Sequence, residues 1–359
     1  MSDLTSPSIR RVVDETMARY RVPGLALAVV RGGGPAETLL VGHDADGATI
    51  TRDSLFPVAS ITKLATALAV LRLKDQGALM LDAPLSRYLP DAEAAQDGVT
   101  LRALLCHTAG LPVDLAPHAA PYAPGLDWPT LARVCLATPL SEMPGTVVVY
   151  SNVGYGLLAL AVERETGLPF PTALRQLVLD PLGIEAYLGD EPPRPSARVA
   201  DVRGRHRGTE REPFNSWFWR SLALPWAGLV TTVDGALAVL LAFQGTPGGF
   251  LAAATRADAV RNQVGDLRGE SGVLSWEWSP WGLGPELRDA KTPHWAPSEA
   301  GPESYGHAGA SGCVVWASPD HDVVYAFLGA RVADGGWMVR GGPAIGAAII
   351  TAGSAGSAA

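Results

Sequence analysis

Residues 57–63 read Pro-Val-Ala-Ser-Ile-Thr-Lys, and an apolar run over residues 64–73 follows them directly. Pro57 and a candidate N-cap at Ser60 precede residues of high helix propensity, so we expect Ser60 to open a helix. Positions three apart share one helix face, which places the Lys63 amine within reach of the Ser60 hydroxyl. A hydroxyl beside an amine is the arrangement of a nucleophile and its base.

The rarity of lysine gives this motif weight. Lysines occupy only positions 63, 74 and 291, although the chain has 28 lysine and arginine residues in all. Arginine cannot lose its proton in a protein, so a chain that otherwise uses arginine must keep lysine wherever it needs an amine base. For this segment alone, the alternative is that Ser60 is an ordinary helix cap and Lys63 a solvated surface residue.

Composition and charge narrow the class of protein. With 359 residues, of which 47% are hydrophobic, the chain can bury a sizeable core as one large unit or two interlocked lobes. A formal net charge of −8 offers no basic surface for nucleic acid or an anionic membrane, so neither partner is expected. The first residues lack the pattern of an export signal, which favours the cytoplasm. The apolar tract 222–243 is interrupted by Pro225 and Asp234, so no membrane span is expected.

Cofactor chemistry has no signature in this sequence. The three cysteines, Cys106, Cys135 and Cys313, lack metal-site spacing and lie among apolar residues, so we expect buried free thiols. The histidines show no metal-binding spacing either, and we find no Gly-x-Ser-x-Gly turn, phosphate loop or dinucleotide fingerprint. The sequence therefore predicts neither a metal nor an organic cofactor.

The order of elements predicts an α+β fold. Helical periodicity or capping predicts helices over residues 9–20, 60–77, 126–136, 152–166, 172–179, 251–264 and 343–351, and another within 229–243 that Thr231 or Thr232 would cap. Short apolar runs bounded by turn residues predict strands over residues 25–30, 38–42, 273–283, 304–316 and 323–330, with a hairpin turn at 318–321. Residues 190–212 are rich in Pro, Arg and Gly, which favours a surface crossover.

Strands at both ends and helices between them imply a sheet built from the two termini with a helical lobe inserted in the middle. We expect one unit over residues 7–353. Its α/β lobe would comprise about 7–56 plus 265–353, and its helical lobe about 57–264. A frayed tail over 354–359 would follow.

Two further segments carry polar groups suited to a site. Tyr150-Ser151-Asn152 precedes a predicted helix and offers a phenol and a carboxamide on a loop. His307-Ala308-Gly309 lies in a glycine-rich strand, where the missing side chains would let a substrate approach the backbone. Taken alone, the second segment favours the plainer interpretation of a bent strand without a functional role.

Together, in this order and spacing, the three segments resemble the serine β-lactamase and penicillin-recognising superfamily, closest to its class C and family VIII carboxylesterase branch. The resemblance extends over most of the chain through three more segments, 105–112, 180–184 and 227–232. It implies an antiparallel β-sheet flanked by N- and C-terminal helices, an inserted all-helical lobe, and a site between the two.

The resemblance also implies roles. Ser60 would be the acylating nucleophile, Lys63 would take or relay its proton, and Tyr150 would be the second proton-transfer residue; which of Lys63 and Tyr150 is the formal base stays open. Asn152 would orient the substrate and Lys63. The backbone N–H groups of Ser60 and Ala310 would form an oxyanion hole.

His307 and Gly309 would belong to the substrate-binding strand. We further expect a cationic Lys63 to favour the phenolate of Tyr150, and partial burial to lower the pKa of Lys63. His107 could serve as the base of a catalytic triad, but it lies in one of the segments shared with the family, where the resemblance implies a structural, hydrogen-bonded loop histidine.

Departures from the family pattern bear on the substrate. Ala308 stands where penicillin-recognising members carry a hydroxyl that helps to bind the substrate carboxylate. Without that charge-assisted hydrogen bond, the binding free energy of an anionic substrate is weaker by about 1.5–3 kcal/mol. Two tryptophan clusters could form an apolar wall for an acyl group or could pack the lobe boundary: Trp217, Trp219 and Trp226, and Trp276, Trp278, Trp281 and Trp295.

We therefore expect a serine hydrolase that works through an acyl-enzyme, a carboxylesterase on small uncharged esters. Within enzymes the alternative is an amidase, a D-aminopeptidase or a weak β-lactamase. From another class, the alternative is a non-catalytic binding or scaffold protein on the same fold. The expected partner is a small-molecule ester or amide, and the sequence leaves the oligomeric state open.

Overall fold

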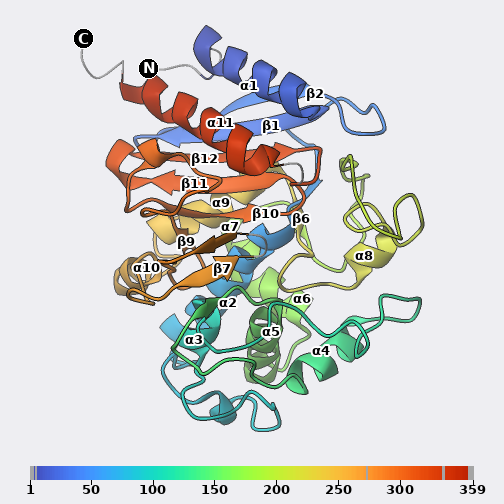
Figure 1. The fold of residues 1–359 in the computed structure, drawn as a ribbon, viewed down its shortest axis with the longest axis vertical. Helices are drawn as coiled ribbons and strands as arrows, with labels where there is room; N and C mark the ends of the chain where they lie inside the picture. Colours follow the sequence, from blue (N-terminus) through green and yellow to red (C-terminus); the bar gives the residue numbers. More distant parts are fainter. Residues whose placement is uncertain (1–3, 5, 272–273, 334–335, 355–359) are drawn as a thin grey trace.

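The computed structural model describes residues 4, 6–271, 274–333 and 336–354. Its main feature is a six-stranded antiparallel sheet in the order β2-β1-β12-β11-β10-β9 (Figure 1). The strands are β1 (Gly24–Arg31), β2 (Glu37–Gly42), β9 (Glu286–Leu287), β10 (Tyr305–Gly309), β11 (Cys313–Ser318) and β12 (Val323–Gly329). Because β1 pairs with β12, the two ends of the chain meet in the middle of this sheet.

Helices cover both faces of the sheet. The terminal helices α1 (Pro7–Tyr20) and α11 (Trp337–Ser354) lie together on one face, and α9 (Val233–Gln244) lies on the other (Figure 1). Alternate residues of a strand point to opposite faces, and β1 follows this rule. Leu25, Leu27 and Val29 join the core under the terminal helices, whereas Ala26, Ala28 and Val30 join the larger core that includes α9.

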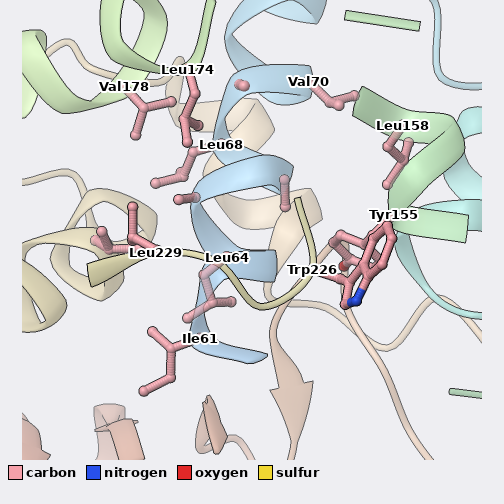
Figure 2. Close-up of a cluster of buried hydrophobic side chains, with 14 of the residues drawn as sticks. Ile61, Leu64, Leu68, Val70, Tyr155, Leu158, Leu174, Val178, Trp226 and Leu229 are labelled. Carbon is pink, nitrogen blue, oxygen red and sulfur yellow. The ribbon is translucent and has the colours of Figure 1, made fainter. Parts of the chain in front are cut away.

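The helical part of the molecule is built around α2 (Thr62–Asp75), in which eleven of fourteen residues are buried. Figure 2 shows apolar side chains from other segments, among them Leu158, Leu174 and Leu229, around this helix. A helix buried on all sides is held rigidly in place. The helices α5 (Asn152–Thr166), α6 (Phe170–Leu174) and α9 lie against α2. The other helices of the middle of the chain are α3 (Leu101–Leu105), α4 (Trp128–Leu136), α7 (Asp180–Leu182), α8 (Trp217–Ser221) and α10 (Ala253–Ala259).

Two small sheets lead into the segments singled out in the sequence. In the first, β3 (Phe56–Pro57) pairs with β6 (Val230–Thr231), which also pairs with β5 (Ala186–Tyr187); β3 runs directly into the Ser60 turn. In the second, β4 (Val148–Val149) runs into Tyr150. It pairs in parallel with β7 (Gly269–Ser271), and β7 pairs with β8 (Leu274–Trp276).

The expected α+β class is confirmed, with an antiparallel main sheet, terminal helices on one face and a helical part between the sheet-forming ends. The predicted helix over residues 152–166 has the observed bounds. The hairpin of β1 and β2 and the crossover at 190–212, which carries no helix or strand, are also as expected. The three cysteines are buried and free. Within the described ranges, no helix combines the length and the apolar character that a membrane crossing requires.

Several predicted boundaries were wrong. The helix predicted over 251–264 spans only Ala253–Ala259, and no strand extends past Trp276 in the segment predicted as 273–283. The last helix begins at Trp337, so Pro343 lies inside it rather than near its first turn. Trp337 and Met338 are buried in the sheet core, and this packing outweighs the local preference for Pro343 as a start.

The helix predicted over 172–179 begins earlier, as α6, and continues as a π-helical turn, η3 (Arg175–Leu179). Of the predicted frayed tail, Ser354 ends α11, and residues 355–359 lie outside the described residues, as do residues 272–273 of the predicted strand. The division of the chain into two lobes at residues 57 and 264 stays a prediction.

Candidate active site

The turn that carries Ser60 has an unusual backbone. Ser60 lies in the 3₁₀ helix η1 (Ala59–Ile61), and α2 begins after it at Thr62, so the prediction that Ser60 caps the helix was wrong. Ala59 has φ = +46°, a left-handed conformation that costs energy for any residue with a side chain. Thr62 Oγ1 donates to the carbonyl of Ala59 (2.6 Å) and accepts from the N–H of Leu229 (3.0 Å), which fixes the strained turn.

Lys63 is completely buried one turn after Ser60. Its Nζ lies 3.5 Å from Ser60 Oγ, 2.8 Å from Asn152 Oδ1 and 3.1 Å from the carbonyl oxygen of Trp226. Burial holds the pKa of Lys63 well below its usual value, and the negative charge of Asp114 acts in the opposite direction. The lowered pKa agrees with the sequence expectation, whereas the Trp226 carbonyl had no signal in the sequence.

Tyr150 follows β4, and its backbone N–H donates to the carbonyl of Glu270 (3.2 Å). The Lys63 Nζ lies over the phenol ring, 4.5 Å from its centroid. Burial raises the pKa of Tyr150, and a hydrogen bond with Ser60 acts in the opposite direction. The expectation that Lys63 would favour the phenolate was therefore wrong, because desolvation outweighs every favourable contact of the hydroxyl.

The ring of His107 packs against the ring of Tyr150. Its ring centroid lies 4.7 Å from that of Tyr150, and its Nδ1 accepts the N–H of Ser151 (3.0 Å). The ring is buried, and desolvation together with the charge of Lys63 keeps the pKa of His107 well below its usual value, so the imidazole is neutral. This is the hydrogen-bonded loop histidine that the resemblance implied. Trp281 completes the packing, with its ring centroid 5.8 Å from Tyr150.

Asn152 is the first residue of α5, and the preceding Ser151 caps that helix by accepting the N–H of Gly154 (3.1 Å). The cap orients the carboxamide of Asn152. Its Oδ1 accepts from Lys63, and its Nδ2 donates to Asp114 Oδ2 (3.3 Å). Asn152 therefore links the buried amine to an exposed carboxylate that the sequence analysis did not single out.

The strand β10 lies directly against the Ser60 turn. A Cβ on Gly309 would lie 2.2 Å from the carbonyl oxygen of Val58, so only glycine permits this approach. His307 is buried earlier in the strand, with Nδ1 2.7 Å from the carbonyl of Ala308, and burial lowers its pKa to about 4. The next residue after the strand, Ala310, borders the same two cavities as Ser60.

Two cavities meet at Ser60 and Ala310. Cavity A has a volume of about 440 Å³ and is bordered by Asn152 and Asp114 and by an aromatic wall of Tyr122, Phe214, Trp219 and Trp226. Cavity B has a volume of about 530 Å³ and is bordered mainly by Tyr150, His307, Leu274, Trp295, Met338 and Val339. Both volumes suit a small organic group.

Only some tryptophans of the two predicted clusters border cavity A or cavity B. Trp219 and Trp226 border cavity A and Trp295 borders cavity B, as the apolar-wall interpretation expects. Trp217 and Trp278 are 44% and 43% exposed, and neither borders the two cavities. Trp276 borders a separate cavity beside β7 and β8. Across the described ranges, no group of three or more His, Cys, Asp or Glu side chains is placed to hold a metal ion.

Comparisons with known proteins identify the family of this chain. A family model described as Beta-lactamase matches residues 9–340. The chain is 32% identical over 316 residues to penicillin-binding protein 4 of Amycolatopsis lactamdurans, covering 83% of this chain and 77% of that protein. It is 33% identical over 315 residues to esterase EstB of Burkholderia gladioli, covering 76% and 77%. The structure of a β-lactamase from Mycobacterium bovis matches with a TM-score of 0.67 and 27% identity, covering 94% and 97%. With matches of this length in sequence and in fold, the chain belongs to the β-lactamase family.

Proposed function

We propose that the protein is a serine hydrolase that works through an acyl-enzyme, and that it acts as a carboxylesterase. The observation that carries this proposal is the surroundings of Lys63. A neutral amine has two N–H donors and one lone pair. Asn152 Oδ1 and the Trp226 carbonyl accept two N–H groups of Lys63, and Ser60 Oγ lies 3.5 Å from the same nitrogen, so a neutral Lys63 can turn its lone pair toward the Ser60 hydroxyl. With its pKa lowered by burial, Lys63 is suited to be the base.

Acylation then moves two protons. Lys63 takes the proton of Ser60 as Oγ attacks the ester carbonyl, and the backbone N–H groups of Ser60 and Ala310 stabilise the oxyanion. Tyr150, whose raised pKa keeps its hydroxyl protonated, donates its proton to the leaving alcohol. The acyl-enzyme therefore holds a Lys63 ammonium and a Tyr150 phenolate.

Deacylation reverses these transfers. Water attacks the acyl carbonyl and gives its proton to the Tyr150 phenolate. Ser60 Oγ leaves as the acid is released, and it takes its proton back from Lys63. Both groups return to their neutral states, so the cycle is balanced without a metal or an organic cofactor.

The proton donor also orients the substrate. Tyr150 borders cavity B but not cavity A, so the leaving alcohol belongs in cavity B and the acyl group in cavity A. His307 is neutral near pH 7 and Ala308 has no hydroxyl, which disfavours a carboxylate in cavity B. The similarity to esterase EstB supports an ester substrate. Because the chain is also similar to penicillin-binding protein 4, the experiment below includes a β-lactam as well.

The test compares wild type, Ser60→Ala and Tyr150→Phe with a fluorophosphonate probe, p-nitrophenyl butyrate and a chromogenic cephalosporin. We expect probe labelling and ester turnover in wild type and neither in Ser60→Ala. Tyr150→Phe should lower ester turnover by at least about 100-fold, because no donor protonates the leaving group. Ser275→Ala, at an exposed serine of the cavity beside β7, is the matched control and should behave as wild type. Hydrolysis of the cephalosporin without hydrolysis of the ester would contradict the esterase proposal and favour a β-lactamase. No reaction with any of the three reagents would favour a non-catalytic protein.

A further inference from the structure

The second tryptophan cluster surrounds a buried ion pair. Lys291 Nζ donates to Glu286 Oε1 (2.9 Å), and both side chains are completely buried; we call these two residues the buried pair. The same nitrogen lies 4.9 Å from the ring centroids of both Trp276 and Trp281. The other carboxylate oxygen, Oε2, accepts the indole N–H of Trp295 (2.9 Å). Three tryptophans that the sequence singled out therefore contact one pair of charges.

Stability alone does not account for this pair. Although burial acts in the opposite direction, the charges of Lys291 and His294 hold the pKa of Glu286 well below its ordinary value. A buried carboxylate needs a counter-charge, which Lys291 supplies. Taking two charges out of water is costly, and neutral side chains of similar size are often at least as stabilising. A role in the neighbouring site is the better explanation.

Trp281 connects the buried pair to the proposed proton donor. Lys291 Nζ donates to the carbonyl of Pro280 (3.0 Å), the residue before Trp281, and so holds this segment by its backbone as well as by the ring. The Trp281 centroid lies 5.8 Å from that of Tyr150 and 4.7 Å from that of His107, which itself packs against Tyr150. A shift of Trp281 would therefore leave space behind the Tyr150 ring and change the direction of its O–H.

Trp295 connects the buried pair to the cavity for the leaving alcohol. Its ring borders cavity B, whereas neither member of the buried pair borders cavity A or cavity B. Glu286, which accepts the indole N–H, lies in β9 opposite Gly306 of β10, one residue before His307. The carboxylate is thus fixed to the main sheet and holds the wall of cavity B from behind.

We propose that the buried pair positions the proton donor: it holds Trp281 against the ring of Tyr150 and Trp295 in the wall of cavity B. This inference rests on the proposed acyl-enzyme function. Lys291 and Glu286 are positioning residues that do not touch the substrate. Their effect is therefore greatest on esters whose leaving group most needs a proton.

The test compares benzyl butyrate with p-nitrophenyl butyrate. Both esters form the same butyryl-enzyme, so the ratio of their kcat/KM values depends only on the leaving group. The p-nitrophenolate ion is a far weaker base than the benzyl alkoxide, so its departure depends less on the proton from Tyr150. A displaced Tyr150 should therefore lower the benzyl-to-p-nitrophenyl ratio. A smaller folded fraction would lower both rates equally and leave the ratio unchanged.

The main variant replaces both members of the buried pair, Lys291→Met together with Glu286→Gln, so that no unpaired charge stays buried. We expect its ratio to fall by about tenfold, within the loss that a misplaced catalytic group produces. Besides burial, the charge of Glu286 raises the pKa of Tyr150. Removing that charge makes the phenol a stronger acid, which would raise the ratio, so a fall reports a change of position. Tyr150→Phe should lower the ratio further, because no donor remains.

Trp281→Phe keeps the buried pair and tests the same contact should the double variant be unstable; its ratio should also fall. Fluorophosphonate labelling measures the nucleophile without an alcohol to protonate, so its rate should stay within about twofold of wild type in both variants. Glu212→Gln is the matched control. Glu212 is almost completely buried and pairs with Arg198 (2.6 Å), and it does not border cavity B. Its ratio should stay within about twofold of wild type.

Circular dichroism establishes which variants fold. An unchanged ratio in the folded double variant, or in folded Trp281→Phe, would overturn the inference, while wild-type turnover of both esters left the proposed function standing. A ratio that falls equally in Glu212→Gln, or labelling that slows as much as benzyl ester turnover, would indicate general damage and also refute the positioning role. Wild-type protein that turns over neither ester and takes up no fluorophosphonate would overturn the proposed function and with it the inference.

Discussion

The Lys63 Nζ lies over the ring of Tyr150, 4.5 Å from the ring centroid, and the two side chains are the proton-transfer pair of the proposed site. Burial disfavours the charged form of each, so the pKa of Lys63 is lowered and that of Tyr150 is raised. The two shifts favour the neutral form of each group in the free protein. In the proposed acyl-enzyme the groups carry opposite charges, and the ammonium and the phenolate would stabilise each other.

Replacing Lys63 by methionine should abolish ester turnover and stabilise the fold. Methionine is similar in size and has no charge to desolvate, so we expect a gain of at least about 1 kcal/mol near neutral pH. Between the lowered pKa in the folded protein and the value of 10.5 in the unfolded chain, the unfolded chain binds more protons. Wild-type stability should therefore rise with pH through this window, and the variant should lack that slope. Denaturant unfolding from about pH 6 to about pH 10 measures both effects.

Lys74→Met is the matched control for this prediction. Lys74 is partly exposed at the end of α2, where its Nζ contacts Thr255 Oγ1 (2.6 Å), far along the helix from Ser60. The same change of charge there should leave ester turnover within about twofold. A Lys63→Met variant less stable than wild type at every pH would show that the contacts of Lys63 outweigh its desolvation.

The sequence was a better guide to which residues meet at the candidate site than to how those residues are arranged there. Ser60 and Lys63 are three residues apart, and local helical geometry is enough to bring them together, although the helix begins only after Ser60. The family resemblance added Tyr150, Asn152 and the β10 strand, which lie far away in the chain. It could not give their protonation states, because these depend on desolvation, a property of the packed structure.

Two backbone features of the candidate site cannot be predicted from the residue types in the sequence. The Trp226 carbonyl that contacts Lys63 belongs to a residue 163 positions away in the chain. Every residue has a backbone carbonyl, so the residue type at this position gives no sign of the contact. The left-handed Ala59 stands where a sequence pattern would favour glycine. Here the tertiary contacts of Thr62 outweigh the local cost. Features of this kind become visible only when distant segments are placed together.

Replacing Gly309 by alanine should remove activity through the backbone of β10. The new Cβ would lie 2.2 Å from the Val58 carbonyl oxygen, which is backbone and cannot rotate away. The strand must then move from the Ser60 turn and carry the N–H of Ala310 with it. We expect kcat to fall by about 100- to 1,000-fold, the scale of one lost oxyanion donor.

Gly248→Ala is the control for this prediction, because a Cβ on the exposed Gly248 would meet no atom within 4 Å. Its kcat should stay within about threefold of wild type. Circular dichroism and thermal unfolding establish that both variants fold. A folded Gly309→Ala variant with wild-type kcat would refute the oxyanion role proposed for the end of β10.

His107 should act as a positioning residue for Tyr150 and not as a base. Its backbone is left-handed, with φ = +63°, and its Nδ1 accepts the N–H of Ser151. Asparagine tolerates that backbone and offers an acceptor oxygen, whereas alanine offers neither. We expect His107→Ala to lose about 2–3 kcal/mol of stability and about tenfold in kcat, with most of both restored in His107→Asn.

The pH profile separates positioning from proton transfer at His107. The low pKa of its buried ring keeps the imidazole neutral near pH 7, so its titration lies below the working range. If Lys63 is the base, the acid limb of kcat/KM should stay at the same pH in His107→Asn, because the variant leaves the amine and its acceptors unchanged. Loss of that limb in a folded His107→Asn variant, with kcat lowered by more than about 1,000-fold, would make His107 the base and displace Lys63 from that role.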